Sequence, residues 1–423
     1  MNPLLPCGPR VVKQMLPDGL EVRTYEPDDD ASCKDLEVSA SQFQGLGGLI
    51  KAAVQHLSSF DAKPRQFSDH VLLVVSNTET RAVCAVVAVA LKSAFVHGKT
   101  RRCGYVFDLR VSESHQRRGI GSALTREAEK VCQERGVEFL YLSVNNDNAK
   151  AKMLYAANGW VHGSNRALIM RPLLATPAAP KDDAAYARSV GGVRELTTGE
   201  ALKVTGDYYA ARELGPSANE FRAVFQSNQL LGTFAASDNA DGSMAALSLW
   251  HGSTLTSFRP VTLLLPVALW VRLAPFLAAG AVTAAAGLVT LIFRAAPGPV
   301  TQSALALACA AAAGAVATCW RWASSRIAFR ARAFAPVMVG PRGEQLMRAV
   351  HAHVARVARE RGFAVLVINE AIGSPLASCL RGDRPRQSSP RSPTVFWQKS
   401  LSSALPGDLP PLQADMFFDP RDM

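Results

Sequence analysis

The sequence lacks the cysteine spacings of a disulfide scaffold or a zinc site. Its eight cysteines are scattered, no pair has the CxxC spacing, and no cysteine–histidine cluster has metal-ligand spacing. We therefore expect reduced structural thiols in a reducing compartment and no bound metal, with disulfides or a metal site as the less favoured interpretation. A covalent cysteine mechanism has no support, because Cys103 and Cys132 have no histidine partner at a readable spacing.

Aromatic residues and charged residues are also scarce. They make up 7% and 19% of the chain, and no stretch interleaves aromatics with lysine and arginine as single-strand nucleic-acid binders do. The formal net charge of +11 suits an anionic cofactor, an anionic membrane face or nucleic acid. Nucleic acid is the least favoured of the three, because the sequence contains no direct nucleic-acid motif.

The N-terminal stretch lacks the apolar core of a signal peptide. From Met1 to Pro17 it holds Arg10 and Lys13 and no acidic residue, but it is not rich in serine as a transit peptide would be. A disordered lead-in over residues 1–19 is the favoured interpretation.

The next part of the chain has the pattern of a mixed α/β domain over residues 20–173. An irregular helix is expected within residues 31–60, followed by an amphipathic helix over 122–134 and a short helix over 148–157. Apolar or alternating runs predict strands at 20–25, 71–75, 81–95, 104–111, 139–144 and 167–171.

A linker is predicted over residues 174–192, where the stretch 176–185 is rich in proline and alanine. A second unit, residues 193–423, repeats part of the layout of the first. Gln133–Val137 precedes the strand at 139–144, and the similar Arg359–Phe363 precedes another apolar strand. The second copy has no Gly-x-Gly turn, so we expect it to be degenerate, with no cofactor of its own. The elements expected here are helices at 213–225 and 343–361 and strands at 229–236, 244–250, 334–339, 363–368, 395–399 and 415–418.

An apolar insertion, residues 261–320, interrupts this second unit. It contains two uncharged runs, 274–293 and 300–320, each long enough to span a bilayer, and arginines flank the pair on both sides. These runs favour a membrane hairpin, with the α/β domains facing the cytosol. A buried or low-complexity insertion in a soluble cytoplasmic or nuclear protein is the alternative, because both runs are rich in alanine. Residues 381–394 form a basic serine- and proline-rich loop.

The stretch from Asp108 to Gly121 predicts an anion site. An alternating strand runs into a polar turn, then into Gly119-Ile120-Gly121 and the start of a helix. Backbone N–H groups at a helix N-terminus attract anions, and the helix dipole adds partial positive charge. Glycine at positions 119 and 121 lets the backbone approach a diphosphate closely, and Arg117 and Arg118 add full charges.

Two motifs give this turn a context. Gln116-Arg117-Arg118-Gly119-Ile120-Gly121 resembles the Q/R-x-x-G-x-G/A motif of the GNAT N-acetyltransferases. The run Asn148-x-x-Ala151-x-x-Leu154-Tyr155-x-x-x-Gly159-Trp160 resembles the second signature of that superfamily. Residues 105–111, 231–234, 247–250 and 418–422 resemble the plant hookless-type probable N-acetyltransferases, although the apolar hairpin departs from that pattern.

The resemblance implies a GNAT fold, a mixed and mostly antiparallel sheet flanked by helices, followed by the degenerate GNAT-like domain. It also implies direct transfer of an acetyl group from acetyl-CoA to an amine. Tyr155 would protonate the departing thiolate. The residues that the resemblance assigns to the acetyl-CoA site are Leu109, Arg110, Val111, Gln116, Arg117, Arg118, Gly119, Ile120, Gly121 and Asn148.

The base that deprotonates the amine is open between three side chains. Asp108 is the best placed, while Glu113 and His115 lie nearer the expected diphosphate. Tyr155 as a packed core residue and Asp108 as a strand-pairing residue are the alternatives to their chemical roles. The acceptor is expected to be a protein lysine, a protein N-terminus or a small amine. The alternative function is a non-catalytic acyl-CoA-binding regulator.

Overall fold

The computed structural model describes residues 13–40, 42–45, 50–173, 179–252, 256–263, 330–363, 365–371, 379, 394–402, 409–410, 416–417 and 419–422. Contacts divide the chain into two compact units. The larger comprises residues 1–40, 55–257 and 329–423, and the smaller comprises residues 41–54 and 258–328.

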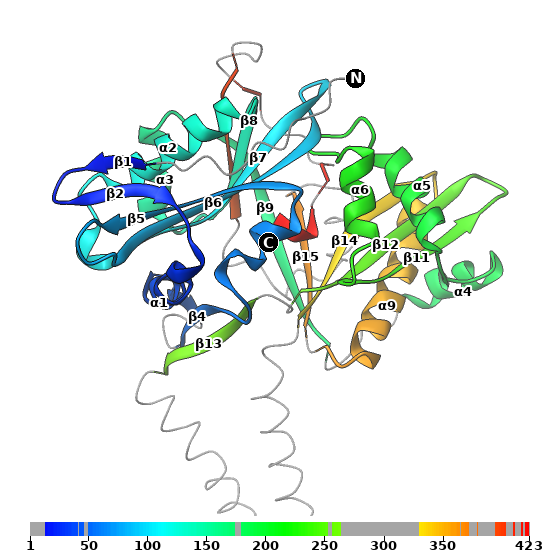
Figure 1. Cartoon of the computed structure of the whole chain (residues 1–423). Helices are drawn as coiled ribbons and strands as arrows, with labels where there is room; N and C mark the ends of the chain where they lie inside the picture. Colours follow the sequence, from blue (N-terminus) through cyan, green and yellow to red (C-terminus); the bar gives the residue numbers. More distant parts are fainter. Residues whose placement is uncertain are drawn as a thin grey trace, which may run out of the picture. The chain divides into compact units, whose positions relative to one another are not determined.

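One mixed sheet forms the framework of the larger unit (Figure 1). Most neighbouring strands are antiparallel, but β7 pairs with β8 and β14 pairs with β15 in parallel. In spatial order the thirteen strands found in the described residues are β1 (Lys13–Leu16), β2 (Leu20–Thr24), β5 (Asp69–Asn77), β6 (Val83–Val96), β7 (Lys99–Val111), β8 (Phe139–Asn145), β16 (Thr394–Ser400), β9 (Val161–Pro172), β15 (Val365–Ala371), β14 (Arg330–Val339), β12 (Ser243–His251), β11 (Leu230–Asp238) and β10 (Arg194–Glu195).

Helices cover both faces of this sheet. The helices of the larger unit are α1 (Asp30–Ala40), α2 (Ile120–Glu134), α3 (Ala149–Ala157), α4 (Lys181–Ser189), α5 (Thr198–Tyr209), α6 (Ala218–Phe225) and α9 (Gly343–Glu360). In the first half of the sheet, α2 and α3 pack with Val106 and Leu142 on one face, while α1 packs with Tyr105 and Phe107 on the other. Successive strand residues therefore point into different cores, as the alternation of a strand requires.

The parallel strand pairs are each joined by a helix, α2 in the first half and α9 in the second. Each leading strand also contains a bulge at a residue with positive φ, Asp108 (51°) in β7 and Ala335 (49°) in β14. Each helix is followed by a left-handed glycine, Gly136 or Gly362. The same strand–helix–strand layout thus occurs twice, but both copies contribute to one sheet within one unit, and the division into two domains stays a prediction.

The strand β16 joins the C-terminal part of the chain to the first half of the sheet. It pairs antiparallel with β8 and with β9, so that Phe396 lies opposite Ser143 on one side and Ser164 on the other. Its side chain Phe396 is buried and stacks on Tyr141, with ring centroids 6.0 Å apart. A segment more than two hundred residues away in sequence therefore completes this half of the sheet.

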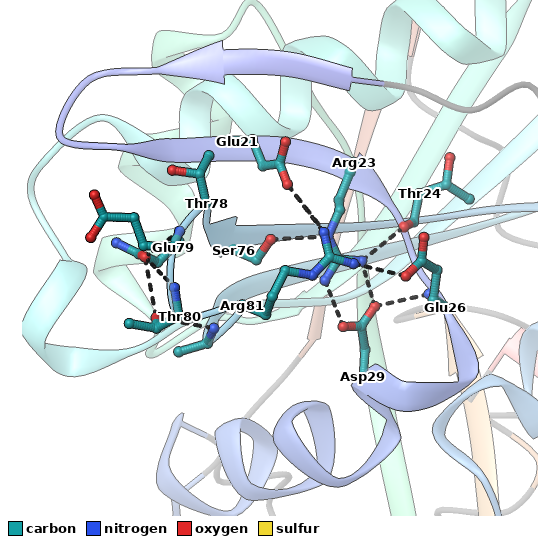
Figure 2. A network of polar contacts seen from close by, with 12 residues as sticks. Glu21, Arg23, Thr24, Glu26, Asp29, Ser76, Thr78, Glu79, Thr80 and Arg81 are labelled. Atoms are coloured by element: carbon teal, nitrogen blue, oxygen red, sulfur yellow. Dashed lines mark hydrogen bonds and ion pairs between the residues drawn. The ribbon is translucent and has the colours of Figure 1, made fainter.

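A buried ion pair fixes the start of α1 to the sheet (Figure 2). Arg23 of β2 donates to both carboxylate oxygens of Asp29 at 2.7 Å and to Ser76 Oγ of β5 at 3.0 Å. Burial opposes the charged form of Asp29, but the bonds from Arg23 and from the Glu26 backbone, with the charges of Arg23 and Arg81, together outweigh it, so the pKa of this carboxyl lies below its usual value. Asp29 lies in η1 (Pro27–Asp29), directly before α1, so the pair sets where α1 begins.

The larger unit differs from the sequence-based expectation in several places. Residues 13–16 of the expected lead-in form strand β1, because they pair antiparallel with β2. Residues 181–189 of the expected linker form α4, which is anchored by Ala187 in the core and by an Arg348–Asp183 pair at 2.6 Å. Residues 416–417 are not a strand, although Phe417 is buried.

The smaller unit contains strands where an irregular helix was expected. Its sheet has the order β13 (Thr256–Leu263), β4 (Ile50–His56), β3 (Gln42–Gly45), with β3 and β4 antiparallel. Pairing with β13, which is distant in sequence, overrides the weak local helix pattern. The runs 274–293 and 300–320 and the loop 381–393 lie outside the described residues. Among the described residues, no helix is long and apolar enough to cross a bilayer.

Candidate active site

The site begins at the bulge in β7. Val86 pairs with Arg110 and Ala88 pairs with Phe107, so Asp108 and Leu109 together lie opposite one residue of β6. Asp108 has a φ of 51°, a conformation that costs a non-glycine residue about 1–2 kcal/mol. A bulge of this kind bends its strand, and here the bend comes where β7 leaves β8.

The two parallel strands separate at this point and form a fork. Their pairing runs from Cys103 opposite Phe139 to Val106 opposite Leu142. Beyond Val106, residues 107–111 of β7 pair with β6 alone among the described strands. The edge of β7 that faces away from β6 therefore presents backbone N–H and C=O groups along the stretch that includes Leu109, Arg110 and Val111.

The turn after β7 leads into the N-terminus of α2 as a cradle of backbone amides. Arg117 and Gly119 have positive φ values of 63° and 75°, and Gly119 is the N-cap of α2 without a side-chain capping bond. Within the described part of the chain, the amides of residues 117–122 donate no backbone bond, and Ala123 is the first that donates, to Gly119 O at 3.0 Å. Unpaired donors at a helix N-terminus attract anions, and the predicted anion site at this turn stays a prediction.

The side chains around the turn are arranged in two ways. Gln116 supports the turn, because its Nε2 donates to Val111 O at 3.2 Å and its Oε1 accepts from Lys150 Nζ at 3.3 Å. Arg117 and Arg118 are exposed, and Arg118 also pairs with Asp18. The turn therefore carries two exposed guanidinium groups, one of which is paired with a carboxylate.

Close packing of α2 against α3 depends on Gly121. A Cβ atom at this position would lie 3.2 Å from Leu154 Cδ1 and 3.6 Å from Val111 Cγ2. Ile120, next to it, is buried in the core beneath the turn. Asn148 is the N-cap of α3, and its side-chain oxygen accepts from Ala151 N at 3.0 Å. The oxygen of Asn148 thus has a structural partner, and its expected contact with the cofactor stays a prediction.

Tyr155 lies on the α2 and α3 face of the fork. It is 6% exposed, and its ring lies 5.5 Å from that of Trp160. Burial raises the pKa of the Tyr155 hydroxyl to about 12, against an opposing effect of the Arg110 guanidinium. Leu109 and Val111 of β7 pack against the same core cluster as Tyr155.

The α1 face of the fork carries a cluster of charges. Arg110 lies between two carboxylates, 3.6 Å from Asp108 and 3.5 Å from Glu37, a buried residue of α1. Glu113 is exposed in the turn, and His115 Nδ1 bonds the hydroxyls of Ser112 and Ser114. Of the three candidate bases, Asp108 is the one at the fork.

Sequence reasoning missed several charged residues on this face. Lys63 is buried, with Nζ 4.3 Å from the centroid of Phe107. Asp422 accepts hydrogen bonds from Lys92 Nζ at 2.7 Å and Tyr141 Oη at 2.6 Å. The residues next to Lys63 form no motif that would have pointed to it. For Asp422, the one available indication was that residues 418–422 resemble the plant hookless-type proteins.

The second copy of the layout fills the equivalent position with side chains. The carbonyl of Pro336, at the bulge of β14, accepts a hydrogen bond from Tyr209 Oη at 2.6 Å. The Tyr209 ring packs at right angles to that of Phe417, with centroids 5.0 Å apart. The helix α9 begins at Gly343, closer to its bulge than α2 is, so the second copy has no room for a turn like that of residues 112–119.

Burial also determines the reactivity of the described cysteines. Cys33, Cys84, Cys103, Cys132 and Cys379 are free and buried. Burial raises the pKa of both Cys103 and Cys132 to about 12, so neither forms a thiolate readily near neutral pH.

Comparison with known proteins agrees with the motifs at the fork. Residues 50–160, which include the bulge, the glycine turn, α2 and α3, match the model of the Acetyltransferase (GNAT) family. The chain carries a GNAT acetyltransferase domain. The predicted resemblance to this family is therefore confirmed.

The similar curated proteins are plant acetyltransferases. Acetyl transferase GW6a of Oryza sativa subsp. japonica is 26% identical over 223 residues, which cover 50% of each chain. The Probable N-acetyltransferase HLS1 of Arabidopsis thaliana is 25% identical over 255 residues, covering 55% of this chain and 59% of the relative. The chain thus spans about half the length of the curated relatives it matches, and the hookless-type resemblance is confirmed at this low identity.

A solved structure has a similar fold over most of the GNAT-containing chain. N-myristoyltransferase of Saccharomyces cerevisiae, solved with bound myristoyl-CoA, superposes with a TM-score of 0.53 and 10% identity. The match covers 92% of this chain and 84% of the yeast chain. At this identity, the likeness concerns the fold alone.

Proposed function

We propose that this chain is an acetyl-CoA-dependent N-acetyltransferase that transfers the acetyl group directly to an amine. One observation carries the proposal: the fork between β7 and β8 opens beside the unpaired amides at the N-terminus of α2. A long ligand with a diphosphate at one end and an extended amide-containing arm matches both features at once.

The described residues fit such a ligand. The amides of residues 117–121, with Arg117 and Arg118, would hold the diphosphate. The edge of β7 that faces away from β6, at Leu109–Val111, would bond the extended arm, and the missing side chain at Gly121 allows close packing of α2 and α3. When bound, acetyl-CoA supplies an acetyl group that is activated as a thioester.

Tyr155 would donate a hydrogen bond to the departing thiolate. Its pKa of about 12 keeps the phenol protonated at neutral pH, so the donor is present in every cycle. A thiol has a pKa of about 8.5, so a stabilising hydrogen bond is easier to form than complete proton transfer. The charge of Arg110 partly offsets the effect of burial on the pKa of Tyr155 and thus makes the hydroxyl a better hydrogen-bond donor.

Asp108 would take the proton from the acceptor amine. The bulge holds it at the fork, and 14% of its side chain is exposed, so a substrate amine or a bridging water can reach it. Arg110 orients Asp108 through the 3.6 Å contact. The acceptor is an amine, from a protein lysine, a protein N-terminus or a small molecule.

Calorimetry with acetyl-CoA, followed by an assay for CoA release with pooled amines, tests the function. We expect the native chain to bind acetyl-CoA and release CoA when the acceptor amine is present. Gly121→Val should abolish binding, because its Cβ would crowd Leu154 at 3.2 Å and its γ-methyls extend further. Tight binding with no CoA release over any amine would favour the non-catalytic acyl-CoA-binding regulator, and no binding by the native chain would overturn both functions.

A further inference from the structure

Lys63 carries a buried amine that has no polar partner among the residues that the structure describes. It lies between η3 (Phe60–Ala62) and η4 (Pro64–Gln66) and is 8% exposed. Its Nζ lies over two stacked rings, 4.3 Å from the centroid of Phe107 and 6.0 Å from that of Tyr105. Among the described residues, Nζ makes no hydrogen bond and no ion pair.

Lys92 shows what a partnered buried lysine looks like in the same core. It is 5% exposed, and its Nζ lies 3.1 Å from Asp419 and 2.7 Å from Asp422. The carboxylates hold its pKa above the usual value in spite of burial. For Lys63, burial prevails and lowers the pKa of the amine, with Asp108 opposing this effect. The two lysines are therefore both buried, but among the described residues carboxylates pair with the amine of Lys92 and not with that of Lys63.

The position of Lys63 relates it to the fork. Phe107, the ring beneath Nζ, is the first residue of β7 after the last pair with β8, and Asp108 at the bulge is the next. Phe107 points into the α1 face, whereas Tyr155 lies on the opposite face. Nζ thus lies on the acceptor side of the fork, where the acyl end of a cofactor threaded between β7 and β8 would emerge.

We propose that Lys63 accepts an acetyl group from acetyl-CoA bound in the same chain. The inference rests on the proposed function, because it needs acetyl-CoA in the fork. The Nζ lone pair forms a bond to the thioester carbonyl carbon, the carbon–sulfur bond breaks, and the sulfur leaves with the bonding electrons. One amine proton is lost, and the CoA thiolate takes up a proton, so the products are N-acetyl-lysine and CoA.

Acetylation of Lys63 would change the acceptor side of the fork. The amide is neutral, so the attraction of Lys63 to Asp108 and to the face of Phe107 is lost. The added group also occupies space beside the bulge. In the absence of an acceptor, the acetyl group would therefore remain on Lys63 as a stable amide. There it would hinder entry of an external amine.

Peptide mass spectrometry after incubation of the full chain with acetyl-CoA alone tests this inference. We expect acetyl-Lys63 to accumulate while the matched buried Lys92 stays unmodified, because the amine of Lys92 is held by Asp419 and Asp422. Lys63→Arg should remove this acetylation while acetyl-CoA binding measured by calorimetry persists. Lys63→Gln provides a second variant with a neutral side chain for the binding measurement.

The outcomes separate the two proposals. Acetylation of Lys63 that is lost in Gly121→Val supports the inference. Equal acetylation of Lys63 in Gly121→Val or in the unfolded chain overturns it, because the reaction then needs no bound cofactor. Binding of acetyl-CoA without acetylation of Lys63 overturns the inference and leaves the proposed function standing, whereas absence of binding by the native chain overturns both.

Discussion

At the scale of single residues, Arg110 connects the two faces of the fork. It contacts Asp108 and Glu37 on the α1 face, and its charge opposes the burial that raises the pKa of Tyr155 on the other face. A guanidinium stays charged across the working pH range, so its influence on both groups is constant. One guanidinium on the strand between them therefore acts on both the donor and the base proposed for acetyl transfer.

Replacement of Tyr155 by phenylalanine tests the role of the hydroxyl. We expect the rate of CoA release with an acceptor amine to fall about 10²-fold, because a positioned proton donor contributes a factor of this order. The affinity for acetyl-CoA in calorimetry should stay within error, since Tyr155 is buried beneath the site and the ring is kept. Tyr186→Phe is the matched control, because its hydroxyl bonds Asp238 at 2.6 Å in the second half of the sheet. Unchanged turnover in Tyr155→Phe would contradict the donor role.

How far the sequence predicted the site also depends on single residues. Residues 108–121 and 148–160 form continuous motifs, so the sequence alone was enough to propose a function for them. Lys63 and Asp422 come from loops with no periodicity, and the fold alone brings them next to β7 and β8. Sequence reasoning therefore singled out the glycine turn and α3, whose roles stay predictions, and missed most of the charged residues on the α1 face of the fork.

At the scale of elements, the turn between β7 and α2 relies on left-handed backbone. Gly119 has a φ of 75°, and nothing lies within 4 Å of the place where a Cβ would sit. Alanine would therefore meet no clash there but would strain the backbone. Any effect of this substitution on binding would come from a change in the direction of the amides.

Gly119→Ala and Gly98→Ala form a matched pair for this point. Gly98, in the turn between β6 and β7, has a φ of 82° and also has nothing within 4 Å of a Cβ. We expect each substitution to lower the free energy of unfolding by about 1 kcal/mol in urea denaturation. Only Gly119→Ala should weaken acetyl-CoA binding in calorimetry. Equal loss of affinity in both variants would show that the strain, and not the direction of the amides, matters.

The elements that the sequence predicted best have strong periodicity. The helix α2 has Leu124, Ala128 and Val131 on one buried face, and β8 is a short apolar run between polar ends. The expected helix near residues 50–56 is a strand, because β4 pairs with β3 and with the distant β13. The helix α4 was missed because its anchor, Arg348, lies far along the chain.

At the scale of the whole molecule, the C-terminal tail ties parts of the larger unit together. Arg421 pairs with Glu220 of α6 at 2.8 Å, and Lys92 of β6 pairs with Asp419 and Asp422. Burial opposes the charge of Asp419, but Arg421 and Lys92 outweigh it and hold the pKa of this carboxyl far below its usual value. This stabilisation is fully present above the pKa of an unfolded aspartate, about 3.9, and is lost as the pH falls through the lower folded value.

Lys92→Met tests the tail as a structural tie. We expect a loss of about 3–5 kcal/mol in the free energy of unfolding at pH 7, because the buried carboxylates of the tail lose their partner. Lys34→Met is the control, since the Lys34–Asp30 pair on α1 is about one-third exposed and should contribute less than about 1 kcal/mol. Urea denaturation followed by circular dichroism measures both. Equal losses of unfolding free energy in the two variants would mean that the tail contributes no more to stability than an exposed ion pair does.

The pairing of β16 also has a consequence for how the protein is made. The residues that fill the gap between β8 and β9 are 394–400, so they leave the ribosome long after both of those strands. Until then, β8 and β9 each have an exposed edge, and exposed edges pair readily with other chains. This half of the sheet therefore reaches its final form only after translation has passed Ser400, and we expect a product cut short before Thr394 to be prone to aggregation.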